Sequence, residues 1–454
     1  NAWLCTPQSS WSSTRRTLSG KDSSSVKTED AFMRASMPES CLFLTVLSRF
    51  PKLVQVELRA SFQKAKGISR LFNTEAIMMA KAEKSGALRV GVVGMGGIGN
   101  THAASYKKDS LAKLSAVCDV VREKADAAAA THGVKAYYSL KDMLAGEELD
   151  IVDVTTGGYE NGSWHFEPTM EALAAGKHVL CEKPLSNDVG EAREMVRYAA
   201  ERNLYLGCNL NHYFTPTADR ARKYMDDDMV GELVSLIFKV GFNGGEGTYS
   251  FSKSPRFNQP YAHMKAFLTH PFSVMRYFCG DITHVQSFST KPGFRKNKGD
   301  LLVSVNSVHV RFANGAVGYL MSHRGDAVWG LGGWWSCEVA GSKGTFCIEN
   351  CIEKLTYWPA VKRGETFGLG QGPKPEVLDT GIADFGATFP LRIHAYLEDV
   401  GNGVPRDRLR SSGRDALATL EYIWAVIESY ENGGALVRPR PLPTIHGDPR
   451  IERI

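Results

Sequence analysis

The sequence lacks any apolar run that approaches the roughly 20 residues needed to span a bilayer, and a candidate such as residues 41–47 is about a third of that length. It also has little net charge outside its first 80 residues. Eleven of the 54 Lys and Arg residues and six of the 49 Asp and Glu residues lie in residues 1–80, which leaves 43 of each sign in the rest. The body therefore has no basic footprint for nucleic acid. We expect a soluble chain of two or three domains that binds neither membrane nor nucleic acid.

Cysteine usage points to a reducing compartment. The nine cysteines are scattered, odd in number and mostly embedded in apolar runs. Cys347 and Cys351 form the one close pair, and no second pair stands at the spacing of a zinc site. Such usage is typical of a reduced protein. We predict no metal site and a cytoplasmic location.

The N-terminal part differs from the rest in composition. Residues 1–78 are rich in serine and weakly periodic, and strong patterning begins only after Met78 and Met79. We predict that this segment is a disordered extension or a stretch that is not part of the natural product, with an organellar targeting peptide as the alternative.

Regular alternation of apolar strands and helices begins at Leu88 and predicts a doubly wound parallel sheet over residues 86–210. The expected strands are 88–93, 113–119, 135–138, 151–155, 178–181 and 205–208. The expected helices run from the glycine turn through Tyr106 and then over 125–131, 140–145, 167–175 and 189–201.

Longer alternating strands follow Asn211 and predict an α+β domain over residues 211–440, built on a large and mainly antiparallel sheet. The expected strands are 233–242, 282–289, 300–312, 316–322, 335–340, 344–350 and 354–357. The expected helices are 217–226, 267–279, 392–401 and 414–432. Because helices leave one face of such a sheet bare, we expect a homodimer or homotetramer through this sheet. Residues 441–454 form the predicted C-terminal tail.

A glycine fingerprint, GMGGIG, connects the first strand to the first helix. Such a turn lets a dinucleotide pyrophosphate sit on the helix N-terminus, and Asp119, twenty residues later at the end of a strand, can accept the ribose hydroxyls. Asp119 would repel a 2′-phosphate and favours NAD, whereas Arg122 leaves NADP open. The predicted cofactor-binding residues are Gly94, Met95, Gly96, Gly97, Ile98, Gly99, Asp119, Thr155, Glu182 and Lys183.

The stretch AGKHVLCEKPL, residues 175–185, closely resembles the signature of the Gfo/Idh/MocA oxidoreductases, which include glucose-fructose oxidoreductase and inositol dehydrogenases. The resemblance covers about residues 88–439, with weaker support from 315–318 and 412–417. It implies hydride transfer between a nicotinamide and a carbon-bound hydroxyl of a sugar, polyol or derivative. Lys183 matches the family's active-site lysine. An ammonium there would stabilise a developing alkoxide and relay its proton.

The family also carries an Asp and a His four residues apart on a later helix, and the resemblance places His270 at the histidine. The carboxylate position is Ala266 here. Lys265, His263 or a carboxylate of the substrate are the candidates to fill that gap.

Further substrate contacts are expected from loops and from the crossover between the domains. His165 aligns with a histidine that the family often keeps near the nicotinamide. Asn211, His212 and Tyr213 resemble a segment that lines the substrate cleft, and of these Asn211 and Tyr213 are the predicted contacts. Arg256 lies in an irregular segment and can clamp an anion. Together with Lys183 and His270, these complete the predicted substrate-binding residues.

Two other functions fit the same fold. Some relatives oxidise a sugar only transiently, which would make the chain an NAD-dependent glycosidase or lyase. A nucleotide-sensing regulatory protein can also bind NAD without catalysing a reaction.

Overall fold

A computed structural model describes residues 86–157, 164–242, 261–291, 303–324, 334–361 and 372–443, all within one unit of the chain, Ala80–Ile454. The predictions made for residues 1–78 and for most of the tail 441–454 lie outside these ranges. No helix in the described ranges has the length and apolar character that a membrane crossing requires.

The first half folds into a six-stranded sheet of order β3-β2-β1-β4-β5-β6, in which every neighbouring pair is parallel. This confirms the doubly wound sheet, and the order is that of a dinucleotide-binding fold. Short apolar runs form its central strands because both faces are covered, and all four residues of β4 are buried. The strands are β1 (Leu88–Val93), β2 (Ala112–Cys118), β3 (Lys135–Tyr137), β4 (Ile151–Val154), β5 (His178–Cys181) and β6 (Leu206–Cys208).

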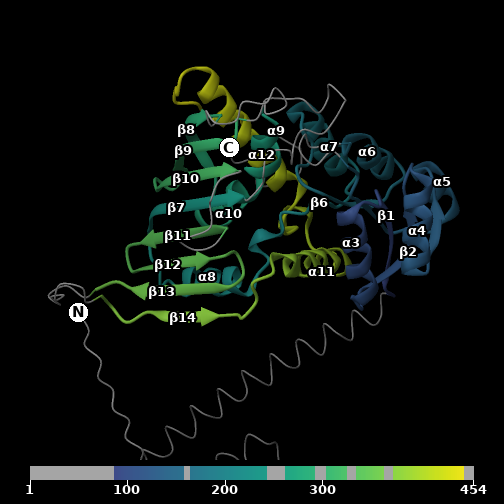
Figure 1. The fold of residues 1–454 in the computed structure, drawn as a ribbon, viewed down its shortest axis with the longest axis horizontal. Coiled ribbons are helices and arrows are strands. Elements are labelled where there is room, and N and C mark those ends of the chain that lie inside the picture. Colours follow the sequence, from purple (N-terminus) through teal and green to yellow (C-terminus); the bar gives the residue numbers. More distant parts are fainter. Residues whose placement is uncertain are drawn as a thin grey trace, which may run out of the picture. The chain divides into compact units, whose positions relative to one another are not determined.

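Helices pack on both faces of this sheet (Figure 1). Ala103 of α3, Ala128 of α4 and Tyr396 of α11 share a core with β1. Residues of α5, α6 and α7 join the core on the other face. The helices are α3 (Gly97–Lys108), α4 (Arg122–His132), α5 (Leu140–Gly146), α6 (Phe166–Ala174), α7 (Val189–Glu201) and α11 (Thr388–Gly401).

The second half forms an eight-stranded sheet of order β14-β13-β12-β11-β7-β10-β9-β8 (Figure 1). It is mainly antiparallel, as predicted, but β7 and β10 pair in parallel. The short strand β14 was not expected. Its strands are β7 (Leu233–Phe242), β8 (Ile282–Thr290), β9 (Val305–Phe312), β10 (Val317–Arg324), β11 (Trp335–Gly341), β12 (Gly344–Glu349), β13 (Lys354–Pro359) and β14 (Glu376–Asp379).

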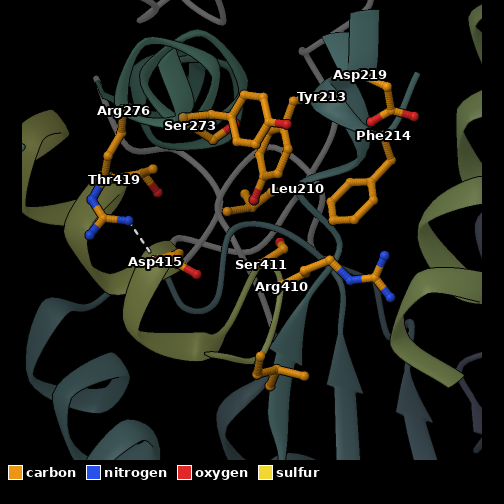
Figure 2. A pocket seen from close by; sticks show the side chains of 12 residues that line it. Leu210, Tyr213, Phe214, Asp219, Ser273, Arg276, Arg410, Ser411, Asp415 and Thr419 are labelled. Carbon is orange, nitrogen blue, oxygen red and sulfur yellow. Dashed lines mark hydrogen bonds and ion pairs between the residues drawn. The ribbon is translucent and has the colours of Figure 1, made fainter. Parts of the chain in front are cut away.

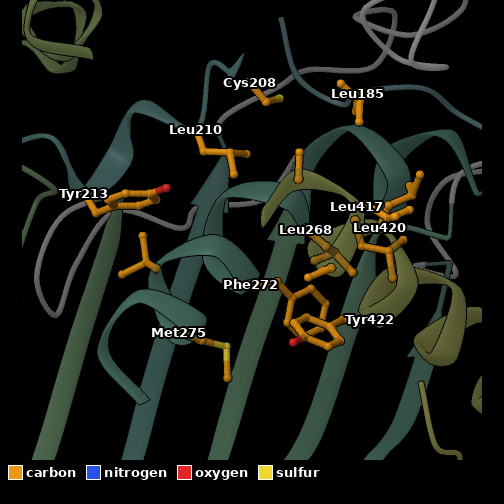
Figure 3. Packing of buried hydrophobic residues seen from close by; sticks show 14 of the residues in the cluster. Leu185, Cys208, Leu210, Tyr213, Leu268, Phe272, Met275, Leu417, Leu420 and Tyr422 are labelled. Carbon is orange, nitrogen blue, oxygen red and sulfur yellow. The ribbon is translucent and has the colours of Figure 1, made fainter. Parts of the chain in front are cut away.

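Helices cover one face of this sheet. Leu268 and Phe272 lie close to Leu417, Leu420 and Tyr422 of the long C-terminal helix, and the ring centroids of Phe272 and Tyr422 are 5.9 Å apart (Figure 3). The helices of this half are α8 (Pro216–Asp226), α9 (Ala262–Phe267), α10 (Thr269–Cys279) and α12 (Gly413–Glu431), with a 3-10 turn η1 (Asn211–Tyr213) at the crossover.

The expected helix boundaries changed at two places. The helix predicted over 267–279 corresponds to α10, which begins at Thr269, and a separate helix that was not predicted, α9, precedes it and ends at Phe267. Helix α11 begins at Thr388, four residues before the expected start, because Pro390 is tolerated in a first helical turn.

The opposite face of the eight-stranded sheet carries exposed apolar side chains. By strand register, Ile237, Phe288, Val317 and Val377 point to this face, and each is more than half exposed. These apolar side chains are spread over strands from the centre to both edges of the sheet, and by register they share the face with polar side chains such as Lys239, Glu338 and Arg311.

Candidate active site

The glycine fingerprint forms the turn between β1 and α3, and two of its glycines are required sterically. Gly94 has φ +98°, and a Cβ there would lie 2.6 Å from the backbone of Thr156. A Cβ on Gly99 would lie 2.0 Å from the carbonyl oxygen of Gly94. By contrast, a Cβ on Gly96 or Gly97 would meet nothing within 4 Å among the described atoms. The turn is thus tightly closed on its inner side and open above Gly96 and Gly97.

The open side is the N-terminus of α3. The N-cap residue Gly96 has no side chain to satisfy the first N–H groups, and the first turn, Gly97 to Asn100, carries no acidic residue. These N–H groups and the helix dipole attract an anion. The free space and the electrostatics of this turn fit the pyrophosphate of a dinucleotide.

Asp119 follows β2 and lies beside this turn. Its carboxylate accepts hydrogen bonds from the backbone N–H groups of Met95 and Val121, both at 2.8 Å. A carboxylate oxygen can accept more than one hydrogen bond, so the fixed Asp119 can still receive ribose hydroxyls. Arg122 stacks on the ring of Tyr138, with Cζ 4.0 Å from the ring centroid.

Thr155, a predicted cofactor contact, is hydrogen-bonded to the backbone at the start of the glycine turn. Its hydroxyl lies 3.0 Å from the carbonyl oxygen of Val93 and 2.9 Å from that of Gly94. The side chain is buried. The Thr155 hydroxyl therefore stabilises the backbone conformation of the turn at Gly94.

Lys183 stands just beyond the end of β5, next to a cis peptide bond to Pro184. Its backbone N–H donates to the carboxylate of Glu182 at 3.0 Å. Its ammonium reaches across to the second half of the chain, 3.5 Å from the carbonyl oxygen of Ala266 and 5.6 Å from the ring centroid of Phe267. Lys183 therefore follows a strand of the nucleotide-binding sheet, while its side chain contacts α9 of the second half.

His270 lies in the first turn of α10, one turn after Ala266. Its imidazole stacks on His212, and the Nδ1 atoms of both rings are buried without a hydrogen-bond partner among the described residues. Burial, then His212 and Lys183, lowers the pKa of His270 well below its usual range. Burial and Lys183 likewise lower the pKa of His212. Both imidazoles are thus neutral, and both lie within the electrostatic reach of Lys183.

His212 was expected only as the middle residue of the cleft-lining segment 211–213, with no role of its own. Sequence alone places it between Asn211 and Tyr213 without showing which of the three faces α10. The turn η1 directs His212 toward His270, Trp334 and Phe385. A three-residue 3-10 turn at the crossover leaves no periodic signal from which this orientation could be read.

The other predicted substrate contacts occupy different places. His165 lies at the start of α6 with Nδ1 2.8 Å from the Pro184 carbonyl oxygen and Nε2 3.2 Å from that of Thr156, so it braces the lysine turn. Burial lowers its pKa. Asn211 is buried and donates to the hydroxyl of Thr388 at 2.6 Å.

Tyr213 turns away from His212 and stacks on Phe214 and Tyr277. It lines a pocket of about 250 Å³ between α8, α10 and the start of α12 (Figure 2). The cations of this pocket are already engaged in ion pairs, Arg276 with Asp415 and Arg410 with Asp399.

The candidates for replacing the carboxylate at Ala266 are placed only in part. Lys265 is buried, with its ammonium 4.6 Å from the ring centroid of Trp424, and burial lowers its pKa. Arg256 and the side chain of His263 lie outside the described residues. Ala266 itself is fully buried. Within the described part of the chain, no group of three or more His, Cys, Asp or Glu side chains is arranged to hold a metal ion.

Residues 88–210 match the GFO_IDH_MocA family model, described as an oxidoreductase family with an NAD-binding Rossmann fold. The chain is 25% identical over 369 residues to levoglucosan dehydrogenase of Pseudarthrobacter phenanthrenivorans, which is 70% of this chain and 90% of that protein. It is 24% identical over 344 residues to inositol 2-dehydrogenase of Rhizobium meliloti, which is 75% of this chain and 96% of that protein.

A solved structure of levoglucosan dehydrogenase in complex with NADH and levoglucosan has a TM-score of 0.66 to this chain, at 20% identity. The match covers 78% of this chain and 99% of that one, so the two share both halves of the fold. The glycine turn and the segment around Lys183 both lie in the part that matches the family model, so residues 88–210 belong to the Gfo/Idh/MocA family of NAD-binding oxidoreductases.

Proposed function

We propose that the chain is a dehydrogenase that transfers hydride between NAD and a CH–OH carbon of a sugar, polyol or sugar derivative, with Lys183 and His270 at the reacting centre. The observation that carries the proposal is the convergence of one ammonium and two neutral imidazoles at the end of β5, beside the nucleotide-binding turn. The names of the relatives, levoglucosan and inositol dehydrogenases, support this substrate class.

The residues that would hold the dinucleotide are those of the glycine turn and Asp119. The N–H groups of the α3 N-terminus would bind the pyrophosphate, and the carboxylate of Asp119 would accept the ribose hydroxyls. Bound NAD supplies the hydride acceptor, and NADH the hydride donor. Because an uncompensated carboxylate repels a 2′-phosphate, Asp119 favours NAD over NADP, although the neighbouring Arg122 leaves NADP as a weaker alternative.

Lys183 and His270 divide the proton chemistry between them. As a hydroxyl is oxidised, its oxygen develops negative charge, which the ammonium of Lys183 stabilises. His270 is neutral and can therefore accept the hydroxyl proton, and it can return the proton in the reverse reaction. His165 contacts the backbone on both sides of the lysine turn and Asn211 holds the side chain of Thr388, while Arg256 and Tyr213 remain candidate substrate contacts.

The test is a panel of inositols, aldoses, anhydrosugars, sugar acids and glycosides, incubated with the full chain and NAD. We expect NADH to accumulate with at least one member of the panel. Release of an aglycone without net NADH would instead favour the glycosidase or lyase alternative, which Ala266 keeps open because the usual carboxylate is missing. NAD binding with no turnover of any member would favour the regulatory alternative.

We further propose that the chain assembles as a homodimer or homotetramer through the eight-stranded sheet, and that it acts in the cytoplasm. The exposed Ile237, Phe288 and Val317 on one face support an apolar interface there. Light scattering on the wild-type chain and on Ile237→Lys tests the assembly, since a buried lysine at the interface would yield monomers. A wild-type monomer would contradict it.

A further inference from the structure

A buried chain of charged side chains lies directly behind Lys183. His102 projects from α3, one turn after the last glycine of the fingerprint, and its Nδ1 lies 2.7 Å from the carboxylate of Asp153 on β4. Its Nε2 lies 3.1 Å from Oε1 of Glu182. Asn209 donates to the same oxygen of Glu182. All four side chains are less than a tenth exposed.

Two carboxylates flank the imidazole of His102. Its Nδ1 faces Asp153 and its Nε2 faces Glu182, and both nitrogens donate to these oxygens when the ring is an imidazolium. The amide nitrogen of Asn209 also lies 3.2 Å from Nε2. Burial opposes the charge, but Asp153 and Glu182 outweigh it and raise the pKa of His102 to about 10. Burial opposes ionisation of Glu182, but the hydrogen bond and charge of His102, and then the charge of Lys183, lower the pKa of Glu182.

Stability alone does not account for this arrangement. Burying an ionic triad is costly, and apolar residues of similar volume commonly stabilise a core as well or better. Ile151, two residues before Asp153 on β4, fills the same face of the sheet with an apolar side chain. The charged chain also connects two specific places. At one end is α3, the helix whose N-terminus fits the pyrophosphate. At the other end is the backbone N–H of Lys183, which donates a hydrogen bond to Oε2 of Glu182.

We propose that the Asp153–His102–Glu182 chain is a positioning device that couples nucleotide binding at α3 to the placement of Lys183. His102 is part of α3 and contacts Glu182, so a shift or stiffening of α3 is passed to the lysine turn through the bonds from His102 to Glu182 and from the Lys183 N–H to Glu182. The kinetic part of this inference rests on the proposed function. The coupling itself does not, because it concerns the protein and a nucleotide alone.

The test uses ADP as the probe, because ADP can occupy the pyrophosphate and ribose positions but has no nicotinamide that could contact Lys183. Hydrogen exchange is measured on the full chain with and without ADP. In the wild type we expect ADP to slow exchange in residues 94–99 and, by about fivefold or more, in residues 180–186, which is the lower end of typical coupling between sites. In His102→Gln we expect protection of 94–99 alone.

Two further variants separate coupling from folding. His132→Gln is the matched control, because His132 is also a buried histidine that contacts α3, through Asn100 at 3.1 Å, yet it has no link to Glu182. It should keep the protection of 180–186. Glu182→Gln retains an oxygen that can accept from Lys183 and serves if His102→Gln does not fold. It should lose the coupling as His102→Gln does.

Absence of ADP protection at 180–186 in the wild type, or its persistence in the folded His102→Gln and Glu182→Gln variants, would overturn the proposal.

A kinetic experiment tests the same coupling. With a substrate from the panel, His102→Gln should lower kcat by about 10²-fold, as expected for a displaced catalytic group. It should also raise the primary deuterium isotope effect while NADH affinity is kept. A variant that merely folds poorly would lower the active fraction without changing the isotope effect, and this outcome would also count against coupling. If no panel member is turned over, the proposed function fails, and the exchange experiment still decides the coupling.

Discussion

The imidazole rings of His212 and His270 stack with their centroids 3.6 Å apart and their planes 4° from parallel. In this family an Asp commonly stands four residues before the histidine, and here that position is the buried Ala266. A stacked ring provides no negative charge, and two imidazoles at this distance cannot both be protonated without repulsion. His270 is therefore held in place by stacking and stays neutral.

Replacing Ala266 with Asp should change the protonation of His270. A carboxylate four residues earlier on the same helical face favours the imidazolium, so the pKa of His270 should rise from below its usual range. Proton NMR of the histidine Cε1–H signals, assigned with His270→Gln, measures this. Ala266→Asn is the neutral control and should leave the pKa low. A wild-type His270 that titrates near 6.5 would contradict the account.

The charged triad predicts how stability depends on pH. Because the pKa of His102 is raised from 6.5 to about 10 in the folded chain, its stabilising contribution is complete below 6.5 and is lost as the pH rises through about 10. The Tm difference between the wild type and His102→Gln should therefore be largest near pH 6 and shrink toward pH 10. Calorimetry at several pH values checks this. A Tm difference that does not change between pH 6 and 10 would show that His102 is not an imidazolium.

The glycine turn predicts that alanine substitutions at Gly99 and Gly97 have different effects on stability. Gly99→Ala pushes a Cβ into the Gly94 carbonyl oxygen and should cost about 1–3 kcal/mol of stability. Gly97→Ala meets open space and should leave Tm unchanged or slightly higher, since Ala favours a helix. If the pyrophosphate occupies that space, Gly97→Ala should still weaken NADH binding by about tenfold or more, about 1.4 kcal/mol. Melting curves and NADH fluorescence titration measure both, and unchanged NADH affinity in Gly97→Ala would exclude this placement.

Asp119 predicts the nucleotide preference. Asp119→Asn keeps the size of the side chain but removes the charge that favours ribose hydroxyls and repels a 2′-phosphate. We expect NADH affinity to fall by about tenfold, as for loss of a hydrogen bond to a charged group, and NADPH affinity to rise. Arg122→Ala is the matched comparison, and it should lower NADPH affinity only if the Arg122 guanidinium leaves the Tyr138 ring to bind the phosphate. An equal loss for both nucleotides in Asp119→Asn would contradict the assigned role.

The sequence predicted the first half of the fold closely because its signals are local. Strand and helix alternation, the tight glycine turn and Asp119 at a strand end all follow from short segments and fixed spacings. The eight-stranded sheet was predicted in type but not in detail. The parallel pairing of β7 with β10 and the added strand β14 depend on contacts between distant segments, for which the sequence has no short-range signal.

The candidate site was likewise predictable only in part. Lys183 stood out because it lies in a long, specific motif, and Ala266 was recognised as a departure from the family pattern. The stacking of His212 and the Asp153–His102–Glu182 chain were not anticipated. The first arises where the crossover turn η1 meets α10, and the second where α3 meets β4 and the end of β5. Neither periodicity nor spacing reveals which buried polar side chains will meet.

The central claim is that Lys183 serves the chemistry and not the binding of NAD. Lys183→Met keeps the length of the side chain and removes the ammonium. NADH fluorescence titration and kcat, measured on the same preparation with the best substrate of the panel, test the claim directly. The account predicts an NADH Kd close to that of the wild type and a loss of kcat by roughly 10²–10⁴-fold. Turnover at the wild-type rate, or loss of NADH binding in parallel with kcat, would contradict it.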